Sequence, residues 1–222
     1  MKLILATRNS HKACEIAAIL DQKIQVLTLK DIGFRGEIVE NGDTFDENAR
    51  IKVSQLTDFI RASRQFRKEL SMVTLADDSG LEVDALHGAP GVLSARYAGE
   101  AAYDEANHRK LLSALKGVPG PNRAACFRCV LAAVWHNGQA TQKTEIRIFK
   151  GACSGKIGFK PKGQNGFGYD PIFFPEGFCR TFAELTADEK NRISHRAMAI
   201  GKFKKWLDSI IHPDFSRGEH RG

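Results

Sequence analysis

Apolar residues along the chain alternate between short unbroken runs and positions spaced for helices. Apolar runs bounded by polar residues or glycine predict strands over 1–6, 24–29 and 72–76. Ser10 can cap a helix over 11–20, whose apolar positions share one face. Thr44-Phe45-Asp46-Glu47 has the form of a capping box, and the helix behind it is expected to reach about residue 70. Strands and helices therefore alternate, which is typical of an α/β protein.

The middle of the chain continues this pattern. Asp77-Asp78-Ser79-Gly80 is expected to end the strand over 72–76, and 81–86 could extend the sheet. The stretch 87–99 is rich in glycine and proline and predicts a loop, and Asp104 can cap a helix reaching residue 115. Two further strands, over 123–135 and 141–149, flank His136-Asn137-Gly138-Gln139, where Asn-Gly is a strong hairpin signal.

Glycine and proline then dominate up to Pro175. Thr186-Ala187-Asp188-Glu189 is a second capping box, and Ser194 can cap a last helix with one apolar face. The tail from about residue 212 is polar, and we expect it to fray. Because no linker divides the chain, we predict one α/β domain over 1–222, with a long sheet and two lobes.

Composition narrows the class of protein. Hydrophobic residues make up 42% and charged residues 27%, which excludes a disordered chain. The longest apolar run, from Cys129 to Trp135, is far shorter than the roughly 20 residues that cross a bilayer, so no membrane span is expected. Five scattered cysteines favour a reducing compartment, and the apolar start of the chain is too short for a signal peptide. We therefore expect a cytoplasmic protein.

The net charge of +7 favours an anionic partner, which the charge alone leaves open among nucleic acid, anionic lipid and phosphorylated small molecules. The turn from Thr7 to Lys12 joins a predicted strand to a predicted helix, and free N–H groups at such a turn suit a phosphate. Taken alone, this segment is better explained as an ordinary capped turn, and the glycines of a P-loop are missing.

Adjacent carboxylates at Asp77 and Asp78 repel each other unless a cation or hydrogen-bond donors compensate. Mg²⁺ commonly binds one or two carboxylates together with water and phosphate oxygens. Strand alternation sends the two side chains to opposite faces, so one of them would meet the metal. Glu40 could be the second ligand, with Lys52 about two turns into the following helix. The alternatives are a solvated turn and an exposed glutamate.

The loop Gly163–Pro171 contains glycines around two aromatic residues, and so can approach a ligand closely. Phe167 could stack on a nucleobase and Asp170 could accept from its N–H groups; a tight turn with buried aromatics is the alternative. His195 and Arg196 open the last helix, with Lys190 just before it. Cations near a helix start suggest an anion or an electron-rich group nearby, although a surface patch is more common.

Taken together in their order along the chain, these segments identify a family. Matching segments extend from Leu3 to about Ala199, nearly the whole chain. They are Ala6–Lys12, Glu40–Ala49, Ala76–Leu81, Gly88–Tyr97, Gly166–Pro171 and Ser194–Arg196. The chain resembles the inosine triphosphate pyrophosphatases, also called non-standard purine NTP pyrophosphatases or dITP/XTP diphosphatases.

The resemblance implies an elongated α/β fold with a long mixed sheet, a cleft between two lobes, and a homodimer. It implies Mg²⁺-dependent hydrolysis of ITP, dITP and XTP to the monophosphate and pyrophosphate. Glu40 and Asp78 correspond to metal ligands, and Asp78 to the catalytic proton acceptor. The expected substrate-binding residues are Thr7, Arg8, Asn9, Ser10, His11, Lys12, Lys52, Ser79 and Lys190, with Phe167, Gly168, Tyr169, Asp170, His195 and Arg196 at the base-binding end.

The chain departs from the family pattern at two places. Arg8 stands where a small residue is common, a difference that could alter phosphate affinity, and the basic tail beyond Ile211 has no assigned role. Two alternative functions remain: a pyrophosphatase of other modified NTPs, and a non-catalytic nucleic-acid-binding protein. The second leaves the Asp77-Asp78 pair unexplained, so no stable nucleic-acid complex is expected.

Overall fold

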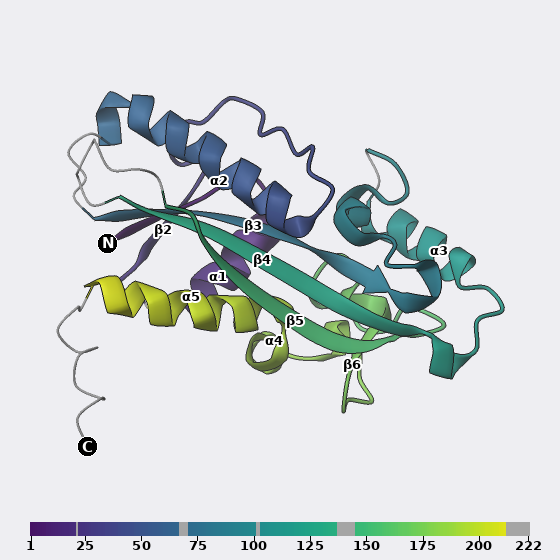
Figure 1. The fold of residues 1–222 in the computed structure, drawn as a ribbon. Coiled ribbons are helices and arrows are strands. Elements are labelled where there is room, and N and C mark those ends of the chain that lie inside the picture. The colour runs from purple at the N-terminus through teal and green to yellow at the C-terminus, as the bar shows by residue number, and fades with distance from the viewer. Residues whose placement is uncertain (21, 67–70, 101–102, 137–144, 212–222) are drawn as a thin grey trace, which may run out of the picture.

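The computed structural model describes residues 1–222 except 21, 67–70, 101–102, 137–144 and 212–222. Six strands form one sheet in the order β2-β1-β3-β4-β5-β6 (Figure 1). The strands are β1 Lys2–Leu5, β2 Gln25–Thr28, β3 Met72–Val83, β4 Ala124–His136, β5 Arg147–Ile157 and β6 Phe173–Pro175. The helices are α1 Ser10–Ile19, α2 Phe45–Ala62, α3 Asp104–Ala114, α4 Ala187–Ile193 and α5 His195–Ile211. β1 is parallel to β2 and β3, and the other neighbours are antiparallel, so the predicted mixed α/β sheet is confirmed.

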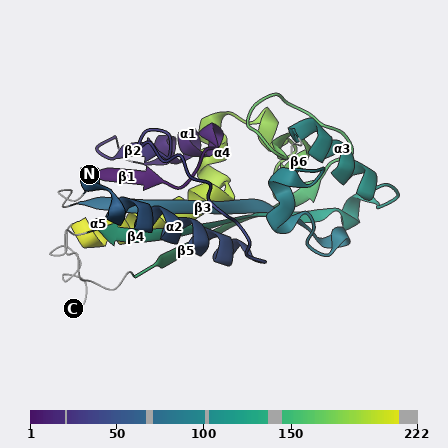
Figure 2. The same cartoon turned by 90° about the horizontal axis from the view of Figure 1, so that it is seen from above.

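Helices cover both faces of the sheet. α2 packs on one face against the even-numbered residues of β3 and β4, among them Met72 and Val130. α1 and α5 pack on the other face against odd-numbered residues such as Val73 and Leu131. A third cluster around Phe127 fills the far end of β3, β4 and β5 beside α3 and β6. Figure 2 shows the resulting two lobes, which the long strands connect.

The largest difference from the sequence prediction lies in β3. Asp77-Asp78-Ser79-Gly80 was expected to end a strand, but β3 continues without interruption to Val83. Aspartate and glycine are poor strand formers, yet the twelve-residue register with β4 overrides that preference. At Gly80 a Cβ would lie 2.5 Å from the Ser94 Oγ, so only glycine fits there.

The free edge of β3 explains why this segment is accessible. β1 pairs with β3 only over Met72–Leu75. Over the next four residues, β4 is the only strand that pairs with β3 in the part of the chain that the structure describes. The backbone N–H and C=O groups of β3 on the side of β1 are therefore not used by a neighbouring strand over these four residues. This open edge lies next to the turn that joins β1 to α1.

Several helix boundaries differ from the predictions. At the starts of α1 and α3, the side chain that was predicted to cap the helix does not do so. Asn9, not Ser10, caps α1, since its Oδ1 accepts from the Lys12 N–H at 3.1 Å. α2 ends at Ala62 rather than near residue 70, with 67–70 outside the described residues. Asp104 is the first residue of α3 rather than its cap, and its carboxylate accepts from the Gly168 N–H at 2.6 Å.

Other predictions are confirmed. Both capping boxes are present, at the start of α2 and of α4. Ser194 caps α5 by accepting from the Ala197 N–H at 3.2 Å. β4 and β5 are antiparallel as the hairpin signal predicted, although β5 continues to Ile157 and the connecting 137–144 and the tail from 212 lie outside the described residues. None of the helices that the structure describes combines the length and apolar character needed to cross a membrane.

Candidate active site

Glu40 and Asp78 meet at one ammonium group. The Lys52 Nζ lies 2.7 Å from the Asp78 Oδ1 and 3.0 Å from the Glu40 Oε2. Lys52 is in the third turn of α2, and Asp78 projects from the face of β3 that α2 covers. The sequence therefore brings these three groups together through the packing of α2 on the sheet.

The loop that carries Glu40 is fixed by the start of α2. The Gly42 N–H donates to the Asn48 Oδ1 at 2.9 Å, and the Glu47 carboxylate accepts from two backbone N–H groups in the capping box. A Cβ at Gly42 would lie 2.6 Å from the Glu47 Cβ, so the close approach requires glycine. The Glu40 side chain itself remains 37% exposed.

Asp78 has the features of a ligand for a cation. Its Oδ2 is buried and has no hydrogen-bond partner among the described residues. Burial raises the pKa of Asp78, and the neighbouring Glu40 adds to this while Lys52 opposes it. No group of three or more His, Cys, Asp or Glu side chains placed to hold a metal ion occurs among the described residues. Two carboxylates, one with a free oxygen, suit Mg²⁺ that takes its remaining ligands from phosphate and water.

Asp77 points to the opposite face of β3, as strand alternation predicted. It accepts from the Lys12 Nζ at 2.7 Å, the Arg196 Nε at 2.9 Å and the Ser79 Oγ at 2.5 Å. Burial acts to raise the pKa of Asp77, but Arg196 and Lys12 outweigh it and hold that pKa well below its usual range. Asp77 therefore keeps its charge and fixes two cations, Lys12 and Arg196.

Glu15 is a further charged residue of the site, partly buried, that the sequence motifs did not identify. Its carboxylate accepts from the Lys190 Nζ at 2.7 Å and from the Arg196 guanidinium. Lys190 also donates to the Asp170 Oδ2 at 2.5 Å. Glu15 lies three residues after Lys12 and therefore on the same side of α1. This spacing could have indicated that Glu15 belongs to the same site as Lys12. The ion pairs join α1, α4 and α5 into one charged floor.

A cavity of about 290 Å³ lies above this floor. Its wall includes all six residues predicted for the base-binding end, which are Phe167, Gly168, Tyr169, Asp170, His195 and Arg196, together with Asn9, Lys12, Ser79 and Lys190. The structure thus brings these predicted residues into one hollow from the two lobes. Tyr169 is the most buried of the aromatic members, and its hydroxyl donates to the Ser94 carbonyl oxygen at 2.9 Å.

The aromatic rings of the cavity are already stacked. Phe167 stacks on His11 with ring centroids 5.2 Å apart and 19° between the planes. His195 stacks on Phe127 at 4.7 Å and 7°. Burial and the neighbouring Arg196 hold the pKa of His195 well below its usual range, so this imidazole is neutral. Its Nδ1 is buried without a hydrogen-bond partner among the described residues.

The predicted residues that do not line this cavity are Thr7, Arg8, Ser10, His11, Glu40, Lys52 and Asp78. Thr7, Arg8 and Ser10 line a separate recess on the other side of the turn after β1, and Asn9 lines both hollows. The predicted phosphate-binding segment therefore forms the boundary between two cavities rather than the wall of one.

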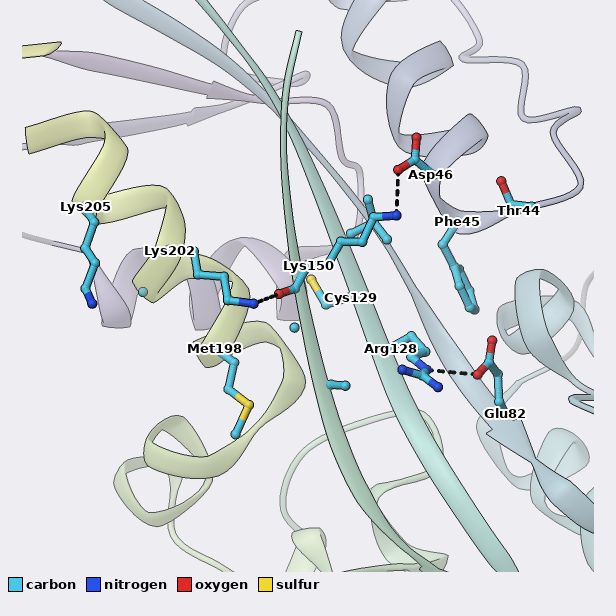
Figure 3. Close-up of a pocket in the computed structure, with 14 residues that line it drawn as sticks. Thr44, Phe45, Asp46, Glu82, Arg128, Cys129, Lys150, Met198, Lys202 and Lys205 are labelled. Atoms are coloured by element: carbon cyan, nitrogen blue, oxygen red, sulfur yellow. Dashed lines mark hydrogen bonds and ion pairs between the residues drawn. The ribbon is translucent and has the colours of Figure 1, made fainter. Parts of the chain in front are cut away.

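A third and larger cavity, of about 800 Å³, lies between the start of α2, β4, β5 and α5 (Figure 3). None of the predicted site residues that the structure describes lines it. Two of its cations are paired within the chain, because Lys150 pairs with Asp46 at 3.0 Å and Arg128 with Glu82 at 2.9 Å. Lys202 and Lys205 have no carboxylate partner among the residues that the structure describes.

The amino-acid sequence is similar to one protein family along nearly its whole length. The model of the Ham1 family matches residues 3–206. A dITP/XTP pyrophosphatase of Porphyromonas gingivalis is 45% identical over 206 residues, covering 93% of this chain and 97% of that protein. One of Bacillus subtilis is 45% identical over 207 residues, covering 93% and 96%.

Solved structures agree with the sequence comparison. The Ham1 protein of Staphylococcus aureus has a TM-score of 0.76 and 37% identity, over 95% of this chain and all of that one. A HAM1 protein of Coxiella burnetii has a TM-score of 0.75 and 39% identity, over 94% and 99%. The similarity thus extends over both lobes and the cleft between them.

Proposed function

This chain belongs to the Ham1 family, and we propose that its cleft hydrolyses the non-standard purine nucleoside triphosphates ITP, dITP and XTP to the monophosphate and pyrophosphate, with Mg²⁺ as cofactor. Such a reaction removes these nucleotides from the pool. The observation that carries the proposal is the free buried oxygen of Asp78, beside Glu40 and two ammonium groups that reach the same strand edge.

The charges of the site explain why a metal is needed. The ion pairs beside the cavity and around Asp78, together called the cleft here, contain four cations and five acidic groups. The cations are Lys12, Lys52, Lys190 and Arg196, and the acidic groups are Glu15, Glu40, Asp77, Asp78 and Asp170. Acidic groups outnumber cations, so the cleft alone would repel a triphosphate. Mg²⁺ held by Glu40 and Asp78 would reverse the local charge and stabilise the negative charge that develops on the phosphate oxygens.

Asp78 has the properties of a general base. A water molecule attacks the α-phosphorus, the bond from that phosphorus to the bridging oxygen breaks, and pyrophosphate leaves with the electron pair. Asp78, or a water that it orients, accepts the proton of the attacking water. A carboxylate whose pKa is raised by burial accepts a proton more readily than an ordinary aspartate, which favours this role.

The lysines act by position and charge. Lys12 is held by Asp77 and Lys52 by Asp78, each at 2.7 Å, so both ammonium groups are fixed before substrate arrives. Groups that are already oriented toward a developing charge require little reorganisation during reaction. Lys190, fixed by Asp170 and Glu15, would hold the nucleotide nearer the base.

The base is expected to be chosen at its six position, where hypoxanthine and xanthine carry a carbonyl and adenine an amine. Arg196 has five N–H donors and uses three on Asp77, Glu15 and Ser79, so donors remain for a carbonyl. The Tyr169 N–H is the alternative donor in the 167–169 loop, because the Phe167 and Gly168 N–H groups already donate to Asp170 and Asp104. The six-amino group of adenine would place a donor against these donors and leave both without an acceptor. Such a mismatch can lower kcat/KM for the wrong base by about 10⁴–10⁵.

Pyrophosphate release from a panel of nucleotides tests the function. We expect turnover of ITP, dITP and XTP in Mg²⁺, much slower turnover of ATP, and loss of turnover on chelation with EDTA. The products must be the monophosphate and pyrophosphate; release of orthophosphate would contradict attack at the α-phosphorus. Equal rates on ATP and ITP would contradict six-position reading, and preference for another modified NTP would favour the alternative substrate class on the same site.

We also propose a cytoplasmic homodimer, which the family resemblance implies. Light scattering after size exclusion should give twice the chain mass of 24.6 kDa. A single-chain mass at micromolar concentration would contradict the dimer.

A further inference from the structure

Two side chains of α3 hold both polar backbone groups of Gly168, which lies in the loop that carries Phe167. The Asp104 Oδ2 accepts from the Gly168 N–H at 2.6 Å. The His108 Nε2 is hydrogen-bonded to the Gly168 carbonyl oxygen, and since a carbonyl oxygen can only accept, Nε2 carries a proton and donates. Asp104 and His108 are four residues apart in the helix, so their side chains lie on the same face of α3. One residue of the loop is therefore held by two successive turns of α3.

The backbone of this loop depends on such bonds because it is rich in glycine. Gly163, Gly166 and Gly168 have positive φ angles of 80°, 76° and 59°. Glycine has no Cβ to restrict its backbone angles, so the peptide groups beside it can rotate at little cost. The bond to Asp104 fixes the peptide group that precedes Gly168, and the bond from His108 fixes the one that follows it.

The bond from His108 also sets the direction of the Tyr169 N–H. The Gly168 carbonyl and the Tyr169 N–H belong to one trans peptide group and point in opposite directions. The carbonyl points to His108, which does not line the cavity of about 290 Å³, whereas Gly168 and Tyr169 do. The Tyr169 N–H therefore points away from His108, and it donates to no residue that the structure describes.

The helix that holds the loop is itself fixed by a buried side chain. Asn107 is 3% exposed, and its Oδ1 accepts from the Ala98 N–H at 2.7 Å. Its Nδ2 donates to the Ala95 carbonyl oxygen at 3.2 Å. The Tyr169 hydroxyl donates to the Ser94 carbonyl oxygen of the same segment at 2.9 Å. Because α3, this segment and the loop are bonded to one another, α3 can hold the loop at a fixed position beside the cavity.

We propose that His108 is a positioning residue for base selection, because its bond to the Gly168 carbonyl oxygen presents the Tyr169 N–H to the six-carbonyl oxygen of the purine. The proposal rests on the proposed function for the identity of the base. Donation to the carbonyl oxygen polarises the peptide group, which strengthens its N–H as a donor. Asp104 supports the same geometry from the other side of Gly168. His108 acts through the loop, since it does not line the cavity.

Three variants of the full chain separate positioning from packing. His108→Leu removes the donor, and His108→Gln keeps an N–H donor at the end of a side chain of similar length. Leu112→Ala, at a partly buried position of the same helix, is the control for general destabilisation of α3. We expect His108→Leu to lower the ratio of kcat/KM for ITP to that for ATP by about tenfold, as for the loss of one hydrogen bond. The other two variants should keep this ratio within about twofold of the wild type.

An NMR measurement tests the Tyr169 N–H directly and needs no turnover. The chain contains three tyrosines, so labelling of tyrosine with the NMR-active nitrogen isotope gives three backbone amide signals, and Tyr169→Phe identifies the signal of Tyr169. IMP should move this signal downfield, because the N–H forms a hydrogen bond to the base carbonyl, and AMP should not. The response to IMP should be lost in His108→Leu and kept in His108→Gln.

The outcomes distinguish this proposal from the function. The positioning role is overturned if the wild-type Tyr169 signal responds equally to IMP and AMP, if His108→Leu keeps the wild-type ratio, or if His108→Gln loses that ratio to the same extent. In each case turnover of ITP by the wild type still supports the function. If the wild type hydrolyses no nucleoside triphosphate, yet its Tyr169 signal distinguishes IMP from AMP only with a donor at position 108, the function fails and the positioning role is supported.

Discussion

The ammonium groups of Lys12 and Lys52 meet at a single backbone oxygen, the carbonyl of Asp77, at 3.5 and 3.3 Å. Lys12 comes from α1 and Lys52 from α2, which cover opposite faces of the sheet. They can share this oxygen because β1 ends beside Leu75 and leaves the next part of that edge of β3 free. Two like charges are thus concentrated at one point, held by Asp77 and Asp78.

Asp78→Asn should lower kcat/KM for ITP by at least about 10²–10³, because it removes both a metal ligand and the proton acceptor. The side chain keeps its size, so the circular dichroism spectrum should not change. Asp84→Asn, at an exposed position shortly after β3, is the matched control and should retain wild-type turnover. Near wild-type activity of the Asp78 variant would remove Asp78 from the mechanism.

Lys52→Gln should shift the acid limb of the kcat/KM profile to higher pH. In the wild type the Lys52 charge lowers the pKa of Asp78 against the effect of burial. Without that charge the pKa rises further, so the ionised carboxylate is lost at a higher pH as the solution is acidified. Lys116→Gln, an exposed lysine, should leave the limb in place. An unshifted limb with reduced kcat would indicate that Asp78 is not the titrating group.

Asp77→Asn should destabilise the fold by about 3–5 kcal/mol near pH 7, because it leaves Lys12 and Arg196 without their buried counter-ion. The folded-state pKa of Asp77 is depressed. Its stabilisation is therefore complete above the unfolded pKa of about 3.9 and is lost as the pH falls toward the folded pKa.

Urea unfolding of both proteins at several pH values measures this effect. The difference in unfolding free energy between wild type and variant should narrow below about pH 4. Asp208→Asn, an exposed aspartate in α5, serves as the control with little change. A difference that stays constant down to pH 3 would contradict the ion-pair origin of the stabilisation.

Phe167→Leu should raise the KM for ITP about tenfold with a smaller effect on kcat. Phe167 presents its ring at the cavity and already stacks on His11, and stacking of a base on an aromatic ring contributes about 1–3 kcal/mol. Binding of inorganic tripolyphosphate should not change, because it has no base. If both ligands weaken equally, the substitution has altered the loop rather than the stacking.

How far the sequence predicts the site depends on the range of the interactions. The capping boxes at Thr44 and Thr186 involve neighbours within a few residues, so their motifs located two helix starts correctly. The alternation of Asp77 and Asp78 between faces is also local and was predicted. The pairing of β3 with β4 is not local, and it turned an expected strand end into the middle of a strand.

Glu15 and Arg8 show the same limit within the site. Glu15 lies on a helix near Lys12, but its partners Lys190 and Arg196 are more than 170 residues away in the chain, and no motif links them. Arg8 was predicted as part of a phosphate-binding turn, yet the structure turns it toward Gly36 and a separate recess.

By itself the sequence determined the α/β class, the starts of α2 and α4, the alternation of the two aspartates and, through its ordered motifs, the family. Only the tertiary structure decided that Glu40, Lys52 and Asp78 meet, that Asp77 binds Lys12 and Arg196, and that the turn after β1 separates two hollows. The physical reason is that caps and strand alternation depend on neighbours in the chain, whereas charge pairing depends on which strand edge is left open when distant segments pack.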